Sequence, residues 1–485
     1  MMDKLRAVLT RKLPSGSFAR NVLTLMTGTT FAQIITIIAA PVLTRLYTPE
    51  DFGIFALYTS ILSILAVISC LRYEQAIVLP EKEEAAANLL VICVLICSGM
   101  AVMILLLVSL FHTRIADILG APELAHWLWL MPLSLLAIGL FQALNYWSTR
   151  RRQFKRLAVR QITRSTATFV SQIGIGTIYP SVSAGGLIGG DLIGQFFATG
   201  RLAWEIGKEE GRKILHTLQW NSAKQVFLRF KIFPLYSSWA SLLNTVSAML
   251  PALLLGFFFT PTVVGFFSLA NRVLAMPIGV IGSSLAQVFF PEATASYRHG
   301  TLNQITLKMF KQLVSLGTVP ILLLTIVAPD LFNILFGHSW IVAGKYVRWL
   351  SLWIFFQFIS SPISTVYVVL EKQKDFLLFN ILLLVTRIIA LVIGGINNDA
   401  MLSIILFGTS GFVMYLFFTI RILTLAGIRQ VEFCSIIGFE IFKSLPYALV
   451  PIALLYLFDN VFLYVLSAIL AGLVFLIRIS YTSIN

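Results

Sequence analysis

Arginines inside long apolar segments are the residues of this sequence best placed to bind a ligand. Arg272 and Arg387 each lie roughly ten residues into such a segment, which is near mid-membrane at a helical rise of about 1.5 Å per residue, and Arg164 lies closer to the end of another. An ionised group in hydrocarbon is costly and normally faces a partner or a watery cavity. Because a guanidinium holds phosphate oxygens through two nitrogens, these residues predict a site for an anionic ligand. The predicted binding set is Arg272, Arg387, Arg164, Asn271 and Gln287.

The same arginines also allow a purely structural interpretation. Arg156, Arg160 and Arg164 follow one another at four-residue spacing and form a stripe along one helix face. Asp191 and Gln195 share a face of the next segment, so the arginines would then simply pair with Asp191. Asp191 is equally a candidate coupling or gating group, because its charge is opposite to that of the predicted cavity.

Motifs for catalysis or cofactor binding are largely absent. The sequence contains no phosphate-loop pattern and no zinc-protease pattern, and its five histidines are scattered. Gly186, Gly190 and Gly194, at four-residue spacing inside an apolar segment, predict a close-packing helix face and not a nucleotide site. Four cysteines lie in or beside apolar segments without acidic or histidine neighbours, which disfavours a metal site or a disulfide framework. We therefore expect no cofactor, no metal and no enzymatic activity.

The composition predicts which type of secondary structure carries these residues. Of 485 residues, 58% are hydrophobic and 12% are charged, whereas a soluble chain has about 25% charged residues. Continuous apolar runs predict helices, since barrel strands would alternate. The expected fold class is an all-α polytopic membrane protein with about fourteen transmembrane helices. The predicted spans are 22–45, 52–72, 85–111, 124–147, 160–179, 184–204, 233–257, 262–290, 309–336, 346–370, 376–396, 400–423, 437–458 and 460–480.

The basic residues predict the orientation of these spans. If the N-terminus is cytoplasmic, nearly all of the 36 Lys and Arg residues fall in cytoplasmic loops. The external loops then hold only Arg45, Arg114, Lys345 and Arg348. Both termini are thus expected in the cytoplasm, and the basic residues at 1–20 precede a first helix that is retained. The net charge of +15 predicts contact with anionic membrane lipids and not with nucleic acid.

An internal repeat predicts the architecture. Thr48-Pro49-x-x-x-Gly53 follows the first span, and Thr260-Pro261-x-x-x-Gly265 follows the seventh. Further matches recur in the same order, and six spans separate the copies, so the repeat is parallel with its pseudo-two-fold axis along the membrane normal. Two six-helix lobes around a central cleft would permit alternating access. The predicted parts are a cytoplasmic segment 1–20, an N-lobe 21–204, a cytoplasmic linker 205–232, a C-lobe 233–425 and two extra helices in 426–485.

Three stretches of the sequence carry a resemblance to known proteins: LTRLYTPEDFG at 43–53, ANRVLAMP at 270–277 and QVFFPEA at 287–293. They resemble the polysaccharide-repeat flippases of the Wzx type, within the multidrug/oligosaccharidyl-lipid/polysaccharide exporter superfamily. The resemblance implies translocation of an undecaprenyl-pyrophosphate-linked oligosaccharide from the cytoplasmic to the periplasmic leaflet of the inner membrane, for O-antigen, capsule or exopolysaccharide assembly. It implies a polysaccharide polymerase and a chain-length regulator as partners. Related lipid II flippases carry charges in their first helix, whereas the first span here is uncharged until Arg45, which disfavours a peptidoglycan precursor as cargo.

Three other functions remain open at this stage. A drug/cation antiporter of the same fold would need more acidic residues in its cavity than this chain offers. A membrane glycosyltransferase, polymerase or ligase would be an enzyme with a sizeable external loop, and no such loop is predicted. A membrane scaffold without transport activity would leave the arginines near mid-membrane as an unexplained cost.

Overall fold

The structure, a computed structural model, describes residues 17–216, 220–278, 282–458 and 460–482. Most of the predicted N-terminal segment 1–20, and the side chain of Gln287, lie outside this description. The described residues form helices and connecting turns, without a β-strand. The chain divides into two compact units, Met1–Leu250 and Pro251–Asn485, which are described separately below.

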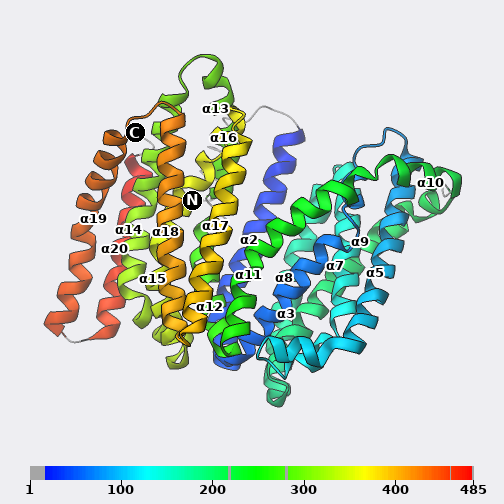
Figure 1. Cartoon of the computed structure of the whole chain (residues 1–485), viewed down its shortest axis with the longest axis horizontal. Coiled ribbons are helices and arrows are strands. Elements are labelled where there is room, and N and C mark those ends of the chain that lie inside the picture. Colours follow the sequence, from blue (N-terminus) through cyan, green and yellow to red (C-terminus); the bar gives the residue numbers. More distant parts are fainter. Residues whose placement is uncertain (1–16, 217–219, 279–281, 459, 483–485) are drawn as a thin grey trace. The chain divides into compact units, whose positions relative to one another are not determined.

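The first unit is built from helices, most of them long (Figure 1). They are α2 (Ser17–Leu46), α3 (Pro49–Ile68), α4 (Tyr73–Ala76), α5 (Glu83–Ile118), α6 (Leu124–Leu128), α7 (Met131–Arg150), α8 (Phe154–Ile178), α9 (Ala184–His216), α10 (Trp220–Arg229) and the first part of α11 (Ser238–Phe258). A single π-turn, Phe233–Ser237, leads into α11. The predicted span 124–147 is interrupted between α6 and α7, where Pro132 begins the second helix at a position that suits proline.

The second unit is likewise built from long helices. They are α12 (Pro261–Pro277), α13 (Ser283–Arg298), α14 (Leu302–Phe336), α15 (Ile341–Ile363), α16 (Val366–Val369), α17 (Gln373–Ile396), α18 (Ala400–Leu425), α19 (Gln430–Phe458) and α20 (Val461–Thr482). The predicted span 262–290 covers α12 and α13, and residues 279–281 between them lie outside the described residues. The predicted span 346–370 falls on α15 and the short helix α16, and each of the remaining predicted spans in this unit coincides with one long helix.

Nine helices of the described chain are long and apolar enough to cross a membrane, and two shorter apolar helices, Pro261–Met276 and Val461–Phe475, accompany them. Helix α8 is not among the nine, because its arginines and hydroxyl side chains lower its hydropathy. The chain is a multi-pass membrane protein, as its composition predicts.

The repeated Thr-Pro motif has a structural cause in both units. Thr48 is the N-cap of α3, and its hydroxyl accepts a hydrogen bond from the Asp51 amide at 3.2 Å. The Asp51 carboxylate in turn accepts from the Thr48 amide at 2.8 Å, which completes a capping box. Thr260 is the N-cap of α12, with Pro261 in the first turn, but its side chain makes no capping hydrogen bond. The motif therefore marks the start of a helix at both places, α3 and α12.

The glycine face predicted in the sixth span packs against the fifth. A Cβ added to Gly190 would overlap Gln172 of α8, and one added to Gly194 would overlap Thr168. A Cβ on Gly186 would overlap the hydroxyl of Tyr47, which donates to the carbonyl of Gln172 at 2.6 Å. The prediction of a close-packing face is thus confirmed, and it fixes the register of α8 against α9.

Gly190→Ala is expected to lower the melting temperature of the detergent-solubilised protein. Overpacking a close helix contact costs typically about 1–3 kcal/mol, which exceeds the gain in helix propensity. Gly200→Ala is the matched control on the same helix, because nothing lies within 4 Å of the added Cβ. Equal thermal stability of the two variants would contradict this account of the α8–α9 contact.

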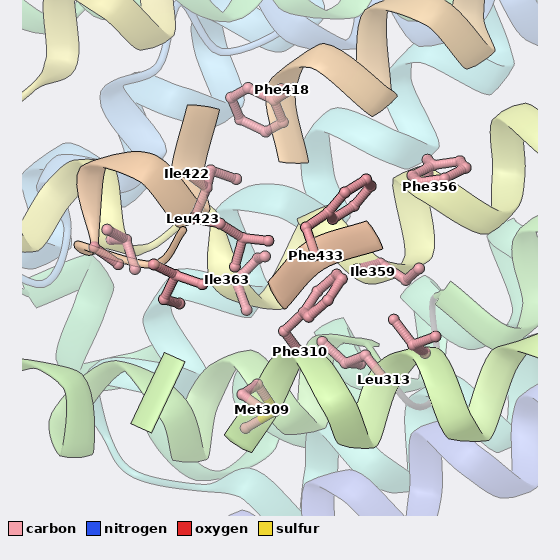
Figure 2. Packing of buried hydrophobic residues seen from close by; sticks show 14 of the residues in the cluster. Met309, Phe310, Leu313, Phe356, Ile359, Ile363, Phe418, Ile422, Leu423 and Phe433 are labelled. Carbon is pink, nitrogen blue, oxygen red and sulfur yellow. The ribbon is translucent and has the colours of Figure 1, made fainter. Parts of the chain in front are cut away.

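Aromatic packing joins four helices of the second unit. Figure 2 shows Phe310 of α14, Phe356 of α15, Phe418 of α18 and Phe433 of α19 in one buried cluster. The ring of Phe418 also stacks on Phe379 of α17 with centroids 3.9 Å apart. Because lipid is as apolar as these side chains, van der Waals packing, and not exclusion from water, holds the helices together here.

Candidate functional site

An ion pair inside the first unit joins the two charges that the sequence singled out there. Arg164 of α8 lies with its Nη2 3.3 Å from Oδ1 of Asp191 on α9. Their side chains remain 35% and 20% exposed, so water or a ligand can reach both. The pairing predicted as the structural alternative is therefore present. Because both side chains are accessible, Arg164 can also leave Asp191 and bind another anionic group.

Arg160, one turn below Arg164 on α8, is the most unusual charge of the unit. Its side chain is 3% exposed, and its guanidinium carbon lies 3.2 Å from the ring centroid of Phe141 on α7. Its Nε and Nη2 atoms are buried and have no hydrogen-bond partner in the described structure. These two nitrogens form one edge of the guanidinium, the edge that can hold an oxyanion through two parallel hydrogen bonds.

Other buried polar groups without partners lie along the same two helices. The side-chain oxygens of Gln195 and Thr199 on α9, and of Thr168 on α8, find no acceptor or donor among the described residues. Buried polar atoms are normally satisfied, so a set of orphans along one helix pair calls for an explanation. A polar ligand or a change of partner during the working cycle would supply it.

Two arginines near the outer end of α8 form ion pairs, unlike Arg160. Arg156, one turn further out on α8, forms ion pairs with Glu205 and Glu209 of α9. Arg151 pairs with Glu210 at 3.0 Å. Along α8, Arg156 at the outer end is therefore ion-paired, whereas Arg160, one turn further in, has no ion-pair partner in the described structure.

Arg387 on α17 is a buried charge of the second unit. Its guanidinium carbon lies 5.1 Å from the ring centroid of Trp353 on α15 and 5.5 Å from that of Phe407 on α18. The hydroxyl of Tyr415 lies within hydrogen-bonding reach of it. No carboxylate pairs with Arg387 in the described structure, and its Nε has no partner there. Cation–π contacts therefore hold this charge.

The remaining predicted site residues lie on two other helices. Asn271 and Arg272 are neighbours on α12 and are half-buried, and Gln287 belongs to α13. Within the described residues no group of three metal-binding side chains occurs.

The sequence missed several members of these sites. Arg160 carried a signal, its four-residue spacing from Arg164, but not one that separated it from the paired Arg156. Phe141, Trp353 and Tyr415 carried none, because aromatic residues are common in apolar helices. Only the packing of α7 on α8, and of α15 and α18 on α17, reveals them as partners of a buried guanidinium.

Comparison with known proteins gives three kinds of match. A family model described as "Polysaccharide biosynthesis protein" matches residues 42–345. The succinoglycan biosynthesis transport protein ExoT of Rhizobium meliloti (strain 1021) is 24% identical over 342 residues, which are 67% of this chain and 63% of that relative. The lipid II flippase MurJ in an inward closed conformation has a TM-score of 0.70 at 15% identity, covering 96% of this chain and 100% of its own.

A second solved structure has the same fold. An inward-facing multidrug resistance transporter of the MATE family, in the MOP superfamily, has a TM-score of 0.61 at 16% identity, over 81% of this chain and 95% of its own. At such low identities these likenesses establish the fold and not the cargo. The expected all-α membrane fold is confirmed.

Proposed function

Because the chain belongs to the polysaccharide biosynthesis protein family, we propose that it is a flippase for undecaprenyl-pyrophosphate-linked oligosaccharide repeat units. The observation that carries this proposal is the buried guanidinium of Arg160, whose Nε and Nη2 atoms have no hydrogen-bond partner in the described structure. A diphosphate is the part of such a cargo that hydrocarbon excludes most strongly, and an arginine edge suits it. A transport protein for succinoglycan biosynthesis and a lipid II flippase among the similar proteins support the proposal.

The cationic groups divide between the two copies of the repeat. The first unit offers Arg160 and Arg164, and the second offers Arg387 and Arg272, with Asn271 beside the last. In the proposed cycle these arginines neutralise the diphosphate while the polyprenyl chain stays in lipid. The parallel repeat would allow the two lobes to open alternately toward each leaflet.

Reconstitution tests the function directly. Proteoliposomes would carry undecaprenyl-pyrophosphate-linked oligosaccharide with a fluorescent sugar, and a membrane-impermeant quencher would be added outside. Without protein about half of the lipid is accessible to the quencher, and with active protein nearly all of it becomes accessible. A chain that leaves the accessible fraction unchanged but moves an organic cation would instead be an antiporter, and the proposal would fail.

We propose that the protein lies in the inner membrane, with both termini and the segment 205–232 in the cytoplasm. This orientation follows from the distribution of Lys and Arg over the loops. On a Cys434→Ser background, Lys208→Cys is expected to react with an impermeant maleimide only after the inner membrane is opened. Thr262→Cys, at the start of α12, is expected to react in intact spheroplasts. The reverse labelling pattern would refute the proposed direction of transport.

Asp191 is proposed as a gating group that releases Arg164 when the anionic cargo arrives. Their exposed pair makes such an exchange feasible. Asp191→Asn is expected to change the flipping rate several-fold while the protein remains folded and inserted, because Arg164 then binds cargo without competition. Unchanged flipping by Asp191→Asn would remove this residue from the mechanism. Arg164→Ala is the companion variant. If the ion pair is only structural, Arg164→Ala should lower the protein level, and adding Asp191→Asn should restore it.

The pathway partners proposed with this function are a polysaccharide polymerase and a chain-length regulator, which would consume the flipped repeat unit. The proposed role is transport, and not catalysis.

A further inference from the structure

A groove lies between α5 and the short helix α10 of the first unit. Its volume is about 510 Å³, within the range of about 300–1,000 Å³ that is typical of ligand sites. Ile92, Leu95 and Ile96 form one wall, and Ala223, Phe227 and Leu228 form the other. The remaining lining residue is Lys224, which gives an apolar groove a single cationic group.

The groove is preformed because α10 is fixed against its neighbours. The hydroxyl of Tyr73 donates to the carbonyl of Phe227 at 3.0 Å, and the two rings stack with centroids 5.0 Å apart. Asn88 of α5 donates to the Ser222 hydroxyl at 3.4 Å. Val226, on the inner face of α10, is buried in the core of the unit. A ligand therefore meets two walls that are already in place.

The surface and charge of the groove determine what can fill it. Leu95 and Leu228 are 60% and 53% exposed, so the walls present apolar surface at the outside of the bundle. Lys224 is exposed and forms no ion pair with any described residue. Arg229 and Lys231 follow on the same segment and are also exposed, so the local charge is positive. An apolar chain attached to an anionic headgroup complements this arrangement.

We propose that the groove binds an anionic phospholipid, with one acyl chain between α5 and α10 and its phosphate on Lys224. The long lysine stem can follow the chain while its ammonium remains at the headgroup level. Helix α10 lies in the predicted cytoplasmic linker 205–232, so the bound lipid would tether this part of the chain to the membrane surface. The proposal does not depend on the cargo of the protein.

Photo-cross-linking in nanodiscs tests this site. The probes are a phosphatidylglycerol and a phosphatidylcholine that carry the same diazirine on one acyl chain, and peptide mapping locates the adducts. Because one lysine near the surface favours an anionic lipid by about 1 kcal/mol, phosphatidylglycerol is expected to label 92–96 and 223–228 about fivefold more than phosphatidylcholine. Lys224→Gln should bring the two yields together, whereas Lys208→Gln, an exposed lysine on α9, should leave the ratio unchanged.

A second variant separates the groove from the charge. Ala223→Phe fills the groove and should lower labelling by both lipids, at an unchanged melting temperature. Equal labelling of the wild type by the two lipids would overturn the proposal, and so would unchanged labelling of both variants. Stronger labelling of these peptides by a diazirine derivative of undecaprenyl phosphate would also overturn it, since the groove would then hold the cargo's tail.

Discussion

Replacing Arg160 with glutamine is expected to lower the flipping rate at least tenfold. A hydrogen bond to a charged group contributes about 1.5–3 kcal/mol, and each 1.4 kcal/mol is a factor of about ten. Arg160 offers two such donors on one edge, at Nε and Nη2, with no protein partner in the described structure. Glutamine removes both the edge and the charge, whereas lysine keeps only the charge, so Arg160→Lys should give an intermediate rate. The quencher assay in proteoliposomes measures all three proteins at equal protein content.

Arg201→Gln is the matched control for Arg160. Arg201 lies on α9 in the same helix pair, is exposed, and is already paired with Glu205 at 3.1 Å, so its loss should leave flipping nearly unchanged. If Arg160 only stabilises the fold through its contact with Phe141, we expect a different outcome. Protein level and melting temperature would then fall together with flipping, and Arg160→Lys would restore all three. Normal flipping by a stable Arg160→Gln protein would exclude Arg160 from cargo binding.

The helices could be predicted from the sequence because the membrane imposes their length and composition. The Thr-Pro motifs could be predicted as matching positions, and they proved to be helix starts in both units, at Thr48 and Thr260. The glycine face of α9 was also readable, since only residues without a side chain let two helices approach so closely. These signals are local or periodic, and a single sequence displays them.

The surroundings of the arginines could not be predicted in the same way. Thr163-Arg164 and Thr386-Arg387 are matching dipeptides of the predicted repeat, yet Arg164 pairs with Asp191 and Arg387 lies against aromatic rings. The difference arises from α15 and α18, which pack near α17 and bring Trp353 and Phe407 to Arg387. Such contacts depend on how helices pack and leave no fixed spacing in the sequence. The repeat therefore predicted where charges lie, but not what holds them.

This difference makes Arg387 the sharper test of the cationic mechanism in the second unit. Arg387→Ala is expected to abolish flipping while protein level changes little, because no described carboxylate is left without its partner when the charge is removed. Breaking a buried ion pair is strongly destabilising mainly through the charge that remains, and no such charge remains here. Arg387→Lys should recover only part of the rate, since lysine lacks the planar fork that binds phosphate through two nitrogens. Arg272→Ala, in the same unit, is expected to act in the same direction.

Trp353 distinguishes a binding role of Arg387 from a structural one. Trp353→Leu removes one of the two aromatic faces and lets the guanidinium move, so the apparent KM for lipid-linked oligosaccharide should rise while the maximal rate changes less. Flipping assays over a range of cargo densities in the proteoliposomes measure both quantities. If Arg387 serves only to fill the space between Trp353 and Phe407, the uncharged, similar-sized Arg387→Met should flip cargo at the wild-type rate. That result, at normal protein level, would refute a role for the Arg387 charge in moving the diphosphate.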